Sequence, residues 1–167
     1  MRPMPIFLIV ALAANAEARL DRIEVSSRAD VIGGKSFGLA GPYEKIVGKA
    51  YFSVRPDNPH NKQIVDLDKS HFNKKGEVEF SADIFILKPK EDGRGNGSLL
   101  LEIPNRGGKG ILRLVNRAGG AVDPTSAADF GDGFLMRQGF TVAWLGWQFD
   151  VADDRGLMRL DAPTAGT

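Results

Sequence analysis

A glycine-rich turn with the sequence PNRGG occupies residues 104–108 and directly follows the apolar run Leu99–Ile103. In an open α/β sheet, a turn at the carboxyl end of a buried strand points backbone N–H groups into the crevice where ligands bind. In acyl-transfer enzymes such N–H groups stabilise the charge that develops on the substrate oxygen. Asn105, Arg106 and Gly107 are therefore candidates for an oxyanion loop that acts through its backbone. The alternative is an ordinary strand-to-helix turn in which glycine only satisfies the backbone geometry.

Ser36 lies in the sequence GKSFG, residues 34–38, which matches the G-x-S-x-G pattern around a hydrolase nucleophile. That chemistry requires a strand before the serine and a helix after it. Gly41 and Pro42 follow too closely for a helix, so the pattern predicts a turn between two strands. The same residues approach a phosphate-binding loop, but Ala29 stands where its first glycine belongs.

His60 and His71 are the two histidines of the chain, and both lie in polar stretches. A triad of Ser36, either Asp66 or Asp68, and His71 has the chain order of some hydrolases, but nothing in the spacing positions the imidazole. Surface histidines are the better interpretation, and their spacing does not indicate a zinc site.

A calcium-loop pattern places Asp66, Asp68, Ser70 and Glu77 at ligand positions, but His71 replaces the glycine that the loop needs. The stretch therefore predicts a solvated turn. There is no cysteine, which excludes a thiol nucleophile and a cysteine-based metal site. The sequence predicts no metal and no cofactor.

The elements that would position these residues follow from the hydrophobic pattern. Alternation of apolar and polar residues predicts an antiparallel, β-rich region over residues 19–97. Nearly continuous apolar runs after residue 97 predict strands that are buried on both faces. The expected strands are Leu20–Ser26, Tyr43–Val54, Gln63–Leu67, Glu77–Leu87, Leu99–Ile103 and Phe140–Trp147.

The residues between the last two strands carry helical signals. Ile111 begins a helical spacing of apolar residues, Ser126 and Asp129 resemble a capping box, and Asp132 suits the start of a short helix. A right-handed crossover between parallel strands is therefore expected. The predicted fold class is α/β: antiparallel strands lead into the first parallel βαβ part of an incomplete α/β-hydrolase-type sheet, over residues 98–167. The tail after Val151 is polar and predicts no further element.

The first eighteen residues have the features of a secretory signal peptide. A positive charge at Arg2 precedes a short apolar run, and small residues suit cleavage after Ala16 or Ala18. The apolar run is shorter than the roughly 20 residues that a membrane-spanning helix needs. A secreted or periplasmic protein is expected, with no membrane attachment after cleavage. The net charge of +1 gives no reason to expect nucleic acid as a partner.

Several long stretches, from residue 21 to the last residue, resemble the N-terminal part of secreted bacterial proteins of the alpha/beta hydrolase domain family. They are GGKSFGLAGPYEKIVGKAYF, VEFSADIFILKP, LLEIPNRGGK and DPTSAADFGDGFLMRQGFTVAWLGWQFDV. The resemblance implies a serine hydrolase that acts on ester or related acyl bonds. It places Asn105–Gly108 at the oxyanion loop, and it places the nucleophile, acid and histidine beyond Thr167.

The leading hypothesis is thus an N-terminal fragment of a secreted hydrolase with a small-molecule or ester-type substrate. Such a fragment would be inactive alone and incompletely packed, and no oligomeric state is predicted for it. The alternative is a secreted β-rich binding or interaction module with Tyr43, Tyr51, Trp144 and Trp147 as its contacts. A minimal esterase that uses Ser36 is the third possibility.

Overall fold

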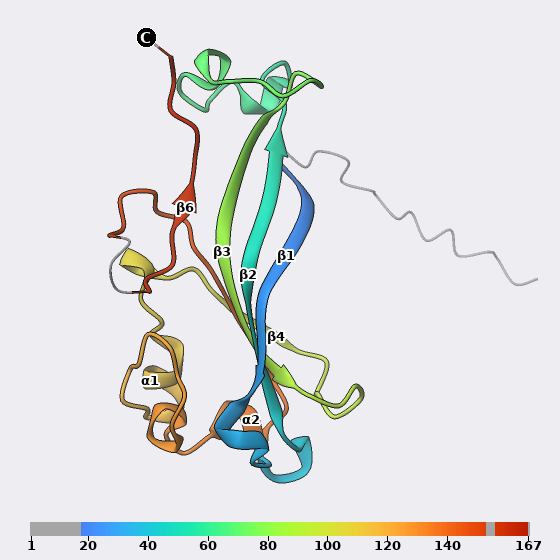
Figure 1. The fold of residues 1–167 in the computed structure, drawn as a ribbon, viewed down its shortest axis with the longest axis vertical. Coiled ribbons are helices and arrows are strands. Elements are labelled where there is room, and N and C mark those ends of the chain that lie inside the picture. The colour runs from blue at the N-terminus through green and yellow to red at the C-terminus, as the bar shows by residue number, and fades with distance from the viewer. Residues whose placement is uncertain (1–17, 153–155, 167) are drawn as a thin grey trace, which may run out of the picture.

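The computed structural model describes residues 18–152 and 156–166, which form one mixed sheet with short helices packed against it (Figure 1). The strand order is β1-β2-β3-β5-β4, and β6 pairs with β3 beside this path. The strands are β1 Ala18–Asp30, β2 Tyr43–Val54, β3 Val78–Pro89, β4 Leu99–Glu102, β5 Thr141–Leu145 and β6 Leu160–Asp161. The predicted signal peptide lies outside the described residues except for Ala18, the first residue of β1.

Strands β2 and β3 are the two long central strands of the sheet. Their antiparallel register runs unbroken from the pair Tyr43–Pro89 to the pair Val54–Val78. Buried and partly exposed residues alternate from Glu44 to Tyr51 in β2, whereas the burial of β3 does not follow a strict two-residue period. β1 is the edge strand beside β2, and its register shifts twice, between Leu20 and Arg22 and between Val25 and Ser27. Such irregularities bend an edge strand and increase its twist.

The second part of the chain adds the strand pair β4–β5 to the same sheet. β5 is buried and lies between β3, to which it is antiparallel, and β4, to which it is parallel. The prediction that Leu99–Ile103 is buried on both faces is wrong, because β4 is an edge strand. Leu99 is 62% exposed and Leu101 is 51% exposed.

The predicted α/β fold class is wrong. The described residues form a mostly antiparallel sheet with one parallel pair, β4–β5, instead of a regular alternation of strands and helices. Only two α-helices occur in this part of the chain, α1 Ile111–Asn116 and α2 Phe134–Arg137. The helical patterns in the sequence each cover only a few residues and do not predict long helices. The sequence between the two helices, RAGGAVDPTSAADFGDG, contains several glycines and a proline, which stop helices from extending.

Short 3₁₀ turns make up the remaining regular structure. They are η1 Val31–Gly34, η2 Gly38–Ala40, η3 Pro59–Asn61, η4 Leu67–Lys69, η5 Asn105–Gly107 and η6 Ala127–Phe130. The predicted capping box of Ser126 and Asp129 is confirmed at the start of η6. Asp132 Oδ1 accepts from the N–H of Phe134, as expected for the residue before α2. The strand predicted over residues 63–67 is wrong, since these residues form turns that lead into η4.

The main core lies between one face of the sheet and the segment that carries α1, η6 and α2 (Figure 1). Trp144, Phe130 and Met136 are among its fully buried side chains. Asn116, at the end of α1, is also fully buried and joins the helical elements. Its side chain donates to the carbonyl of Phe130 and accepts from the N–H of Leu135.

Candidate ligand-binding site

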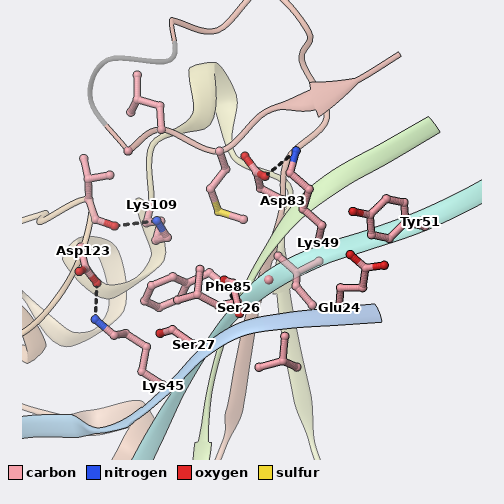
Figure 2. Close-up of a pocket in the computed structure, with 18 residues that line it drawn as sticks. Glu24, Ser26, Ser27, Lys45, Lys49, Tyr51, Asp83, Phe85, Lys109 and Asp123 are labelled. Atoms are coloured by element: carbon pink, nitrogen blue, oxygen red, sulfur yellow. Dashed lines mark hydrogen bonds and ion pairs between the residues drawn. The ribbon is translucent and has the colours of Figure 1, made fainter. Parts of the chain in front are cut away.

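A pocket of about 740 Å³ opens between the sheet and the segments that cross it (Figure 2). β1, β2 and β3 form its floor, and residues 109, 122–123 and 156–158 form its wall. This volume falls within the range of small-molecule sites. The pocket is thus the first candidate for a functional site among the described residues.

The floor is apolar at its centre. Val47 of β2 and Phe85 of β3 are directly paired in the register and lie on the same face of the sheet. Gly48 allows β1 to approach closely, because a Cβ atom there would lie 2.1 Å from the carbonyl oxygen of Glu24. Val25 of β1 and Met158 of the wall add further apolar surface.

Two of the three lysines in the pocket are paired with carboxylates. Lys45 lies 2.7 Å from Asp123, and this ion pair joins β2 to the wall. Lys49 contacts Asp161 closely. It also lies 3.6 Å from Asp83 (Figure 2). The hydrogen bond from Lys49 to Asp161, with the nearby charge of Asp83, raises the pKa of the lysine. Both ammonium groups are therefore already neutralised within the protein.

Lys109 is different, because its charge is met by a backbone carbonyl and an aromatic ring. The residue is only 8% exposed, its Nζ donates to the carbonyl oxygen of Val122 at 2.6 Å, and it lies 4.4 Å from the centre of the Phe85 ring. Among the described residues, no carboxylate lies within ion-pair distance of it. Burial lowers the pKa of Lys109 to about 8, against the opposing effect of Asp123.

The carboxylate of Glu102, at the end of β4, fixes the backbone that carries Lys109. It accepts hydrogen bonds from the N–H of Gly110 at 2.9 Å and of Ile111 at 2.8 Å. It also accepts from Trp144 Nε1 on the neighbouring strand at 2.5 Å. Lys109 is therefore held at the pocket by a network that joins β4, β5 and α1.

The lowered pKa predicts a specific dependence of stability on pH. Below pH 8 Lys109 is charged in both the folded and the unfolded chain, so the folded state carries the full cost of the buried charge. Between pH 8 and about 10.5 the unfolded chain binds more protons, and stability rises with pH. The whole effect corresponds to about 3 kcal/mol.

We expect Lys109→Met to abolish this component. Denaturant unfolding of both proteins at several pH values measures it, and the difference between them isolates Lys109 from the other titrating groups. As the pH rises from 8 to 10.5, the free energy of unfolding should increase more for the wild type than for Lys109→Met. Parallel pH profiles would show that Lys109 is not desolvated.

The predicted oxyanion residues Asn105, Arg106 and Gly107 form η5, outside the pocket lining. The N–H of Arg106 donates to Oε1 of Gln148 at 2.5 Å, and its guanidinium pairs with Asp150 at 2.8 Å. Arg106 has a left-handed backbone, with φ of 54°, a conformation that non-glycine residues seldom adopt. The oxyanion role stays a prediction, and it would require Gln148 to release the Arg106 N–H.

The remaining catalytic candidates lie far apart. Ser36 forms an isolated β-bridge with Pro42, just before β2 begins, whereas Asp66, Asp68 and His71 lie in the loop after β2 ends. The segments before and after β2 lie at opposite ends of the sheet (Figure 1). A twelve-residue strand spans about 35 Å. The structure therefore does not bring the triad together, and the hypothesis of a minimal esterase based on these residues is wrong.

Of the four aromatic contact candidates, Tyr43 and Trp144 are fully buried in the core. They cannot serve as surface contacts, and that part of the prediction is wrong. Tyr51 lines the pocket and Trp147 is exposed.

The pocket was not predicted from the sequence, although β2 carries one pattern that indicates it. Lys45, Val47, Lys49 and Tyr51 occupy alternate positions of β2 and therefore share one face of the sheet, the face that lines the pocket. Lys109 gave no such signal, because its burial depends on contacts with residues distant in the sequence, the carbonyl of Val122 and the ring of Phe85.

Comparisons with protein-family models, with curated proteins and with solved structures each gave no match. The hydrolase resemblance therefore stays a prediction. Within residues 18–152 and 156–166, no helix is long and apolar enough to cross a membrane, and no cluster of side chains is suited to hold a metal ion.

Proposed function

We propose that this chain binds a small molecule that has an apolar body and one anionic group. The observation that carries this proposal is the Lys109 ammonium at the pocket wall, which no carboxylate of the described residues pairs. A buried charge is costly unless it is paired. An anionic ligand group would supply the missing partner.

The charges of the pocket favour a ligand with a single negative group. Lys45 and Lys49 already hold Asp123, Asp83 and Asp161, so a second anion would have to displace a protein carboxylate. The central floor of Val47 and Phe85 offers no polar side chain. A carboxylate with a hydrocarbon or aromatic body matches this arrangement.

A titration with 3-phenylpropanoate tests the proposal, followed by ¹H–¹⁵N spectra of the full chain. We expect the largest shifts at the amides of Val47, Gly48 and Lys109. In Lys109→Gln the dissociation constant should rise about tenfold, the equivalent of about 1.4 kcal/mol for the lost charge pair.

Lys62→Gln is the matched control, because Lys62 is exposed in the loop between β2 and β3. This variant should bind as the wild type does. Equal affinity of the wild type and Lys109→Gln, or shifts confined to residues outside the pocket, would refute the proposal.

The hydrolase function remains a separate hypothesis, as does secretion. The hydrolase hypothesis is compatible with the pocket, because ester hydrolysis produces a carboxylate. In this chain alone, the hypothesis predicts binding without turnover.

A further inference from the structure

We infer that the Lys109 amine is a covalent site, at which aldehydes with an apolar body form an imine with the protein. The inference rests on the proposed function, because it uses the same pocket and the same orientation of the ligand. It adds a substrate class, carbonyl compounds, and a bond to a named atom, Nζ of Lys109.

The surroundings of Nζ suit a nucleophilic amine. The atom lies 4.4 Å from the centre of the Phe85 ring, the carbonyl of Val122 accepts a hydrogen bond from it, and Met158 adds an apolar side chain to the lining of the same pocket (Figure 2). An apolar site of this kind favours the neutral form of lysine, which is the nucleophile in Schiff-base chemistry. The neutral amine can keep the hydrogen bond to Val122 while its lone pair attacks a carbonyl carbon.

The charged groups around Lys109 do not remove this preference. Asp123, Asp83 and Glu102 favour its charged form, but burial, with a smaller contribution from the charge of Lys45, outweighs these three carboxylates. Asp123 and Asp83 contact Lys45 and Lys49 respectively. Glu102 is occupied by the N–H groups of residues 110 and 111 and by the indole of Trp144.

The two other lysines of the pocket provide an internal comparison. Lys45 and Lys49 face the same cavity, but each is paired with a carboxylate, and the hydrogen bond to Asp161 raises the pKa of Lys49. A ligand aldehyde would therefore meet three amines within one pocket. Lys109 is the one of the three that has no carboxylate partner among the described residues and whose pKa is lowered by burial.

The reaction is balanced without any oxidant or reductant. The lone pair of the neutral amine forms a C–N bond to the aldehyde carbon, the carbonyl π pair moves to oxygen, and proton transfer gives a carbinolamine. The nitrogen lone pair then forms the C=N bond while the protonated hydroxyl leaves as water, and the nitrogen loses its remaining proton. One aldehyde is consumed and one water is released for each imine.

The test uses the full chain with 3-phenylpropanal and sodium cyanoborohydride, which reduces the imine to a stable secondary amine. Peptide mass spectrometry then gives the rate of modification at each lysine. At pH 7, amines with pKa values of about 8 and 10.4 differ roughly two-hundredfold in the fraction of the neutral form. We expect Lys109 to be modified at least about tenfold faster than Lys45, Lys49 and the exposed reference Lys62, with a midpoint near pH 8.

Two controls keep a failure of folding separate from a failure of the inference. Lys109→Arg should lose the fast modification and retain the circular dichroism spectrum of the wild type. An excess of 3-phenylpropanoate should slow modification at Lys109 and leave Lys62 unchanged.

The outcomes separate the two proposals. If 3-phenylpropanoate binds at the pocket but Lys109 is modified no faster than Lys62, the imine inference is overturned and the proposed function stands. If Lys109 is modified selectively and 3-phenylpropanoate neither binds nor competes, the site is a reactive lysine and the proposed binding function is refuted.

Discussion

Trp144→Ala is expected to lower the free energy of unfolding by about 3–5 kcal/mol, the cost of deleting a large buried aromatic side chain. Trp144 is 1% exposed and packs edge-on against Phe85, with ring centres 5.5 Å apart. Its indole also donates to Glu102, the residue that holds the backbone next to Lys109. The substitution should therefore disturb both the core and the pocket wall.

Trp147→Ala is the matched control, because it removes the same side chain three residues later. Trp147 is 51% exposed and donates to the carbonyl of Pro104 at 3.0 Å. Its loss should cost about 1 kcal/mol, the usual contribution of one hydrogen bond. Equal effects of the two substitutions in urea denaturation would contradict the placement of Trp144 in the core.

Gly131→Ala is expected to destabilise the chain by about 3–4 kcal/mol, the range of the most severe backbone effects. Gly131 follows η6 with φ of 55° and ψ of −129°, a conformation essentially restricted to glycine. A Cβ atom there would lie 2.0 Å from the carbonyl oxygen of Asn116 and 2.7 Å from the N–H nitrogen of Ala118. These neighbours are backbone atoms, so the clash cannot be relieved by a change of rotamer.

Gly119→Ala provides the comparison, since Gly119 has a negative φ and a Cβ atom there would meet nothing within 4 Å. This substitution should change the free energy of unfolding by less than about 0.5 kcal/mol. Thermal or denaturant unfolding of both variants measures the contrast. A mild effect at Gly131 would show that the end of α1 and the turn after η6 are not packed together.

The strands that the sequence revealed are those whose side chains alternate over many residues. Tyr43–Val54 is predicted with the bounds of β2 itself, because a long two-residue period is a local property. The fold class could not be predicted in the same way. Apolar runs at Leu99–Ile103 and Phe140–Trp147 indicate strands, but whether a strand is central or at the edge depends on its partners.

The strand near the end of the chain, β6, could not be predicted from local sequence either. Leu160 and Asp161 pair with β3, and Asp161 contacts Lys49 at the pocket. A two-residue strand has no local sequence pattern that predicts it, because its formation depends on a partner strand about 80 residues earlier.

The order of strands in the sheet has a consequence for how the chain folds. The centre of the pocket floor belongs to β2 and β3, which are consecutive strands with an unbroken register, and such pairing closes a relatively short loop. The wall follows β4, and β4 reaches the rest of the sheet only through β5, which comes later in the chain. We therefore expect the floor to form early in folding. The wall can form only after β5 has paired with both β3 and β4. We therefore expect Lys109 to become buried at a late step of folding, after β5 has paired with β3 and β4.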